Sequence, residues 1–170
     1  MTTLTIRHYP DTALATPCRP VERFDDDLRV LADGLLAAMR AAPGIGITAA
    51  HVGVPLRLVV IDIDGRVRRY CNPVVEWASD ERTVHPEGSV SMPGVSDLVE
   101  RPARVRVRHQ NLDGEPAVED ADGLLAVCLQ HEIDQLDGIF WLQRLSRLRR
   151  DRVLRRYAKI KRIQSIRNEA

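Results

Sequence analysis

The sequence predicts an α+β domain, and three features of the chain support that prediction. Apolar residues recur at helical spacing in three segments, 24–40, 122–136 and 146–166. Short runs rich in Val and Ile lie between the first two segments. Helices at the ends with strands grouped between them are typical of α+β proteins, because regularly alternating strands and helices would instead indicate a parallel α/β sheet.

The first helix is predicted over 24–40. Its apolar residues fall at positions 28, 31, 35, 36 and 39, which share one helical face. Three aspartates at 25–27 stabilise the positive amino end of such a helix. The Ala42-Pro43-Gly44 sequence then ends it, and the glycine-rich stretch GIGITAAHVG (44–53) is expected to be a loop in which the backbone can approach a ligand closely.

Four strands are expected in the middle of the chain. Val105 and Val107 alternate with arginines and therefore share the buried face of one of these strands. Asp64-Gly65 and the LDGEP sequence at 112–116 predict turns, and Asn72-Pro73 is expected to interrupt a strand. The predicted strands are 56–64, 69–76, 85–91 and 103–111.

The helix at 122–136 carries the sequence HEIDQ at 131–135, which begins like the metalloprotease motif H-E-x-x-H. At 100° per residue, His131 and Gln135 lie about 40° apart on one face, with Cys128 nearby and Glu132 beside that face. A charged glutamate next to an apolar helix face is costly unless it lines a cavity or has a partner. Such strings also occur by chance, so other motifs must decide whether this one marks a site.

Length and composition predict one domain, residues 1–170, that ends in the basic helix at about 146–166. Three widely spaced cysteines predict reduced thiols rather than disulfides, and the chain has neither a signal-peptide pattern at its start nor an apolar run of membrane-spanning length. We therefore expect a cytoplasmic protein with no membrane partner.

Charge is distributed unevenly along the chain. Residues 144–170 hold 11 of the 25 Lys and Arg residues but only 2 of the 24 acids. This asymmetry predicts either an anionic partner for the last helix, such as nucleic acid, or a helix docked on the acidic remainder of the chain. The sequence does not decide between these alternatives.

Three motifs taken together resemble those of the peptide deformylases, which remove the N-formyl group from nascent bacterial polypeptides. The family patterns GxGLAAxQ, EGCLS and QHExDH correspond to GIGITAAH (44–51), EGSVS (87–91) and QHEIDQ (130–135). Further similarity extends over about residues 5–150. The resemblance implies an α+β fold in which strands surround a central helix carrying HEIDQ.

The resemblance also implies roles for individual residues. The family's metal, usually ferrous iron, would be held at Ser89, His131 and Gln135, and Glu132 would move the proton of the metal-bound water. The oxyanion positions would be His51 and the backbone N–H of Val90. The positions implied to hold the methionine side chain are Ile45, Gly46, Gly88, Val90, Val127 and Cys128.

Two of these three ligand positions and the oxyanion glutamine are substituted. A serine hydroxyl and an amide are poorer ligands for iron or zinc than a thiolate and an imidazole. We therefore expect a degenerate member without ordinary deformylase activity, which still binds a formyl-methionyl peptide or a similar small acyl peptide. A divalent transition metal (iron, zinc or nickel) is expected at low occupancy at most, and the favoured expectation is no metal.

Other interpretations stay open at the level of sequence. His51 and His131 could form a rearranged metal site in an active hydrolase, or His51 could fill the vacated space by hydrogen bonding to Ser89 or Gln135. Ser89 could act as a nucleophile with either histidine as base. Because the family acts at the ribosome, the arginines of the last helix could contact rRNA; these are Arg147, Arg149, Arg150, Arg152, Arg155 and Arg156.

Overall fold

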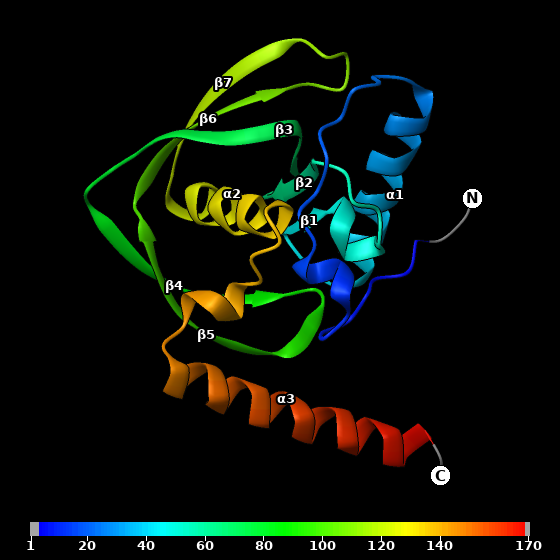
Figure 1. Cartoon of the computed structure of the whole chain (residues 1–170), viewed down its shortest axis with the longest axis vertical. Coiled ribbons are helices and arrows are strands. Elements are labelled where there is room, and N and C mark those ends of the chain that lie inside the picture. Colours follow the sequence, from blue (N-terminus) through cyan, green and yellow to red (C-terminus); the bar gives the residue numbers. More distant parts are fainter. Residues whose placement is uncertain (1–3, 169–170) are drawn as a thin grey trace.

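A computed structural model describes residues 4–168 and confirms the α+β class (Figure 1). Seven strands form two antiparallel sheets in this part of the chain. The larger sheet has the strand order β1-β2-β3-β6-β7, and β4 and β5 form a separate hairpin. The strands are β1 (Gly46–Thr48), β2 (Leu58–Ile63), β3 (Arg66–Ala78), β4 (Arg82–Ser89), β5 (Met92–Pro102), β6 (Arg104–Gln110) and β7 (Pro116–Asp122).

Three α-helices and three short 3-10 helices complete the architecture of residues 4–168. Helix α2 lies at the centre, between the larger sheet and the β4–β5 hairpin, whereas α1 and α3 lie at the periphery (Figure 1). The helices are α1 (Asp26–Ala41), α2 (Gly123–Leu136) and α3 (Arg147–Asn168), with η1 (Thr12–Ala15), η2 (Ala49–Val52) and η3 (Trp141–Arg144). None of the helices in residues 4–168 combines the length and the apolar composition needed to cross a membrane.

The helix ends follow from the local sequence. The Asp25 side chain accepts a hydrogen bond from the Leu28 N–H at 3.2 Å and so caps α1, two residues later than the predicted start. Helix α2 ends at Asp137-Gly138, as the sequence predicted, because Gly138 adopts a positive φ of 77°. Both helices bury leucines, each of which contributes about 1.5–3 kcal/mol.

Three predictions about strands and loops were wrong. The stretch 44–53 is not a loop, since Gly46–Thr48 pairs with β2 and the following residues form η2. Strand β3 is not interrupted at Asn72-Pro73 but bulges there, with Asn72 at a positive φ of 53°. Strands β5 and β7 were missed, because both are rich in acidic or proline residues that periodicity does not assign to strands.

The last helix docks on the remainder of the chain. Val153 and Tyr157 of α3 are buried against Val95 and Val99 of β5, and the Arg149 guanidinium pairs with the Asp97 carboxylate at 2.7 Å. From residue 161 to residue 167, however, every α3 residue is exposed. Self-docking therefore explains the part of this helix up to Ile160 and leaves residues 161–167 solvated.

Candidate active site

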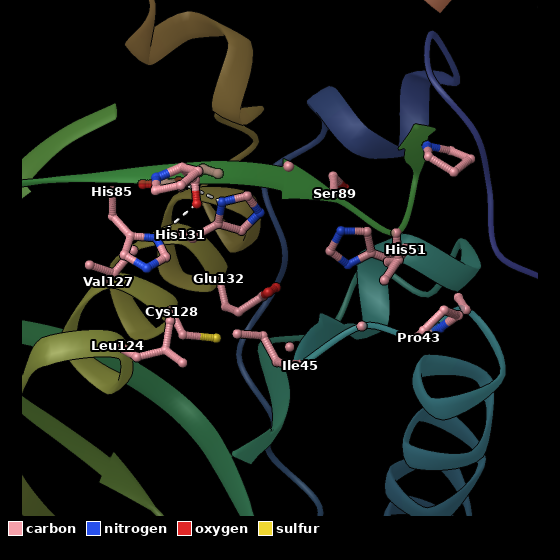
Figure 2. Close-up of a pocket in the computed structure, with 18 of the residues that line it drawn as sticks. Pro43, Ile45, His51, His85, Ser89, Leu124, Val127, Cys128, His131 and Glu132 are labelled. Carbon is pink, nitrogen blue, oxygen red and sulfur yellow. Dashed lines mark hydrogen bonds and ion pairs between the residues drawn. The ribbon is translucent and has the colours of Figure 1, made fainter. Parts of the chain in front are cut away.

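A cavity of about 430 Å³ lies between the central helix α2, the end of β4 and the segment entering β1 (Figure 2). All of the positions that the resemblance assigned to the methionine side chain line it: Ile45, Gly46, Gly88, Val90, Val127 and Cys128. His51, Ser89, His131 and Glu132 line it as well. Gln135 is buried but is not among the lining residues.

Gly46 is the residue that brings the first motif against the central helix. A Cβ atom at this position would lie 2.5 Å from Glu132 Oε1 and 2.8 Å from Cys128 Sγ. Any larger residue would therefore displace the glutamate carboxylate. The glycine of the first motif thus serves close packing between β1 and α2, whereas the sequence had suggested close approach of a loop to a ligand.

A buried ionic network connects β4, β5 and α2 beside the cavity. The Arg101 guanidinium, only 4% exposed, donates to both oxygens of Glu87 at 2.6 and 2.8 Å and to Asp134 Oδ2 at 2.9 Å. Arg144 donates to the same Asp134 carboxylate from η3. Burial alone would raise the pKa of Glu87, but Arg101 and His131 outweigh it and lower that pKa to about 2. Glu87 is therefore an anion.

His131 is oriented by this network. Its Nδ1 lies 2.8 Å from Glu87 Oε1, and because a carboxylate only accepts, Nδ1 carries a proton. Burial lowers the pKa of His131, but the hydrogen bond to Glu87 and the nearby carboxylates raise it overall. In the neutral form Nε2 holds the lone pair, which is the arrangement expected of a metal-ligating histidine with a carboxylate behind it.

His51 is held in the opposite tautomer. The Thr48 backbone N–H donates to His51 Nδ1 at 2.9 Å, so the ring proton is on Nε2. Burial and the neighbouring His131 lower the pKa of His51 to about 3, which keeps the ring neutral. The expectation that His51 bonds to Ser89 or Gln135 was wrong, because its partner is Thr48 in its own 3-10 turn.

Glu132 lies against the cavity as the only acidic side chain there besides Glu87 among the described lining residues. It is 3% exposed, and its Oε2 has no hydrogen-bond partner within residues 4–168. Burial raises the pKa of Glu132 to about 7. The sequence predicted that a glutamate beside an apolar helix face lines a cavity or has a partner, and Glu132 lines the cavity.

The side chains at the three implied metal positions do not form a ligand set for a transition metal. His131 suits the role, but the Ser89 hydroxyl accepts a hydrogen bond from Ser91 N–H at 3.1 Å and is a weak neutral donor. The Gln135 amide nitrogen donates to the Leu14 carbonyl at 2.7 Å, which anchors this side chain to η1. Within residues 4–168, no three His, Cys, Asp or Glu side chains are grouped so that they could hold a metal ion. The residues present therefore do not fit the family's metal.

Sequence reasoning missed several residues at the cavity. His85 and Leu124 stand at its rim, from β4 and α2 respectively, and Pro43 borders it from the end of the α1 segment (Figure 2). Arg101 and Asp134 were not assigned a role either. Arg101 lies between Glu100 and Pro102 in the sequence LVERPARV, where no local pattern distinguishes it from the exposed Arg104, so its buried ion pairs had no signal in the sequence.

The fold and the cavity define a class, an α+β protein with the architecture of the peptide deformylases. The chain superposes on a crystal structure of a peptide deformylase from Legionella pneumophila with a TM-score of 0.91 and 36% identity, covering 96% of this chain and 98% of that one. The polypeptide deformylase family model matches residues 3–151. The chain belongs to the polypeptide deformylase family.

Two Brucella suis proteins show where the chain lies within that family. One, named peptide deformylase-like, is 58% identical over 164 residues and covers 95% of this chain and 100% of its own length. The other, named peptide deformylase, is 43% identical, with 89% of each chain covered. The chain is thus more similar to the first protein than to the second.

Proposed function

We propose that this chain is a metal-independent member of the family that binds formyl-methionyl or similar short acyl peptides without ordinary deformylation. One observation carries the proposal. Gln135, at the third ligand position, is tied to the Leu14 carbonyl and does not line the cavity. Together with Ser89, this leaves His131 as the single imidazole or thiolate at the three implied positions.

Loss of the metal site leaves the rest of the cavity able to hold a peptide. Val127 and Cys128 of α2 are nearly fully buried, and Ile45 and Leu124 present exposed apolar surface at the opening. An unbranched apolar side chain of the size of methionine would bury its surface among these groups. Gly88 and Val90, at the end of β4, offer backbone groups on the opposite wall.

The alternative of an active hydrolase with a rearranged metal site is less well supported. That site would use the ring nitrogens of His51 and His131. His51 has one nitrogen occupied by the Thr48 N–H and the other protonated, so it has no lone pair for a metal. The chain is 58% identical to a protein named peptide deformylase-like and 43% identical to one named peptide deformylase. This difference also favours the proposal that the chain is a degenerate member of the family.

The proposed setting is the bacterial cytoplasm, at or near the ribosome, where formylated chains emerge. The support is electrostatic. Arg152, Arg155 and Lys159 of α3 are exposed, and none of them pairs with a carboxylate among the described residues. A row of unpaired cations along one helix suits a polyanion such as rRNA.

Binding and turnover measured on the same sample test the proposed function. The full chain is titrated with a formyl-methionyl tripeptide, and release of the free amino group is followed in parallel. We expect saturable binding at micromolar to millimolar peptide with no release of amine. Turnover at a rate typical of enzymes, about 1 s⁻¹ or faster, would contradict the proposal, as would the absence of saturation at millimolar peptide.

A further inference from the structure

A second cavity, of about 320 Å³, lies between the amino-terminal segment, η3 and α3. It shares no lining residue with the cavity of the candidate active site. Its walls are mainly apolar and are formed by Tyr9, Leu14, Phe140, Leu142 and Leu154. Small-molecule sites in proteins begin at about 300 Å³ and are mostly apolar, so this second cavity has the size and lining of a site for a small ligand.

The apolar wall of the second cavity is held in place by the surrounding core. The rings of Tyr9 and Phe140 stack with their centroids 5.4 Å apart, and Tyr157 of α3 packs edge-on against Tyr9. Leu14, Phe140 and Leu142 are almost fully buried. A wall that exists before a ligand arrives needs little ordering on binding, so an apolar side chain placed against it gains the full benefit of leaving water.

Two charged side chains, Asp11 and Arg150, line the second cavity without pairing with each other. Asp11 uses Oδ1 to accept from the Ala13 N–H at 2.9 Å, and its Oδ2 accepts from no group within residues 4–168. Arg149 pairs with Asp97 at 2.7 Å, whereas the neighbouring Arg150 guanidinium, half-buried, has no ion pair or side-chain hydrogen bond in the part of the chain that the structure describes. The described lining residues therefore offer a free cation and a free anion beside an apolar wall.

We propose that the second cavity binds a free apolar α-amino acid in its zwitterionic form. The ligand's carboxylate accepts from the Arg150 guanidinium, its ammonium group donates to the free oxygen of Asp11, and its side chain packs against the stacked rings. A ligand with only one charge would cover the other charged group without pairing it, and a buried unpaired charge is costly. The site is independent of the proposed peptide function, because no residue of the candidate active site takes part.

Calorimetry on the full chain tests this site with L-phenylalanine and three analogues. L-Phenylalaninamide lacks the carboxylate, N-acetyl-L-phenylalanine lacks the ammonium group, and glycine lacks the side chain. We expect saturable binding of L-phenylalanine at micromolar to millimolar concentration. Each analogue should bind about tenfold more weakly or worse, because it forfeits one charged hydrogen bond or the buried side chain.

Two conservative variants locate the binding. Arg150→Gln should remove the preference for L-phenylalanine over its amide, and Asp11→Asn should remove the preference over the N-acetyl derivative. Asparagine also caps helices, so Asp11→Asn retains the hydrogen bond from the Ala13 N–H and with it the fold of η1. Arg152→Gln removes the same charge from an exposed position of α3 outside the second cavity and should leave both preferences unchanged.

A competition experiment separates this site from the candidate active site. L-Phenylalanine should bind equally well with and without a formyl-methionyl tripeptide at millimolar concentration, since the two cavities are separate. Displacement by that peptide would overturn the inference, as would the absence of saturation at millimolar L-phenylalanine. Equal affinity for the amino acid and its amide, or unchanged preferences in Arg150→Gln and Asp11→Asn, would overturn it too.

Discussion

The side-chain amide of Gln135 donates a 2.7 Å hydrogen bond to the backbone carbonyl of Leu14, far away in sequence. Gln135 is 1% exposed and Leu14 is 2% exposed, so this bond lies within the protein interior. A residue at an implied metal position therefore joins the central helix to the amino-terminal 3-10 turn. Its role in this chain is structural.

Replacing Gln135 by Leu should destabilise the protein. The Leu14 carbonyl would remain buried without a donor, at a cost of about 1–3 kcal/mol. Urea denaturation measures the free energy of unfolding, and Gln143→Ala on the exposed face of η3 is a matched control with an expected change below about 0.5 kcal/mol. An unchanged midpoint for Gln135→Leu would show that this bond contributes nothing.

Arg101→Ala should be the most destabilising single substitution near the cavity. Arg101 is the only guanidinium that pairs with Glu87 among the described residues, and its removal leaves that buried carboxylate with His131 alone, which costs about 3–5 kcal/mol; Asp134 keeps Arg144. Arg106→Ala removes an equally bidentate pair with Asp120, but at the surface, where about 0–1 kcal/mol is expected. Similar losses for both variants in urea denaturation would refute the distinction.

The buried thiol of Cys71 predicts a loss of stability at alkaline pH. Burial raises the pKa of Cys71 from 9.0 to about 11. The native state therefore holds this proton more tightly than the unfolded state, so the contribution is intact below pH 9 and is lost as the pH rises towards 11. The expected loss is about 3 kcal/mol.

Comparison of the natural protein with Cys71→Ala isolates this effect from other titrating groups. The variant has a packing defect at neutral pH, but its free energy of unfolding should fall less steeply between pH 9 and pH 11. Native thiols should also resist alkylation at pH 8, because all three cysteines are buried with raised pKa values. Parallel pH profiles of the two proteins would disprove the assignment.

The exposed cations of α3 should determine any association with ribosomes. Changing Arg152, Arg155 and Lys159 to glutamine removes three candidate phosphate contacts, so co-sedimentation should weaken and depend less steeply on salt. The control changes Arg66, Arg82 and Arg104 to glutamine. These residues are exposed and lie outside α3, so the control variant has the same net charge as the α3 variant. If both triple variants behave alike, α3 is only a solvated helix.

Much of the fold followed from the sequence because local pattern and tertiary environment agree there. Val105 and Val107 alternate with arginines and are buried as predicted, and the central helix ends at Asp137-Gly138. Strand β7, in contrast, has the sequence PAVEDAD, in which the exposed Asp120 pairs with Arg106 across the sheet and Glu119 lies half-buried on the other face. Cross-strand ion pairs of this kind leave no apolar alternation to detect.

The members of the site were predictable from the three motifs, but their chemical states were not. Ile45, His51, Ser89, Glu132 and the other lining residues within the motifs followed from the resemblance to the family, whereas His85 and Leu124 did not. The tautomer of His51 depends on a backbone N–H three residues earlier, and the displacement of Gln135 from the cavity depends on a carbonyl 121 positions away. Such partners are set by tertiary geometry and are not visible in a motif.

Metal content is the most direct measurement of the central claim, which is that the substitutions removed the metal site and spared the cavity. The natural protein and the triple variant His51→Gln, Ser89→Cys, Gln135→His are purified in parallel without oxygen or affinity tag. Iron, nickel, zinc and cobalt are then quantified per chain, and deformylation of a formyl-methionyl peptide is assayed. We predict clearly substoichiometric metal and no turnover for the natural protein, and about one metal per chain with turnover for the variant. One metal per chain in the natural protein, with deformylation, would contradict the account.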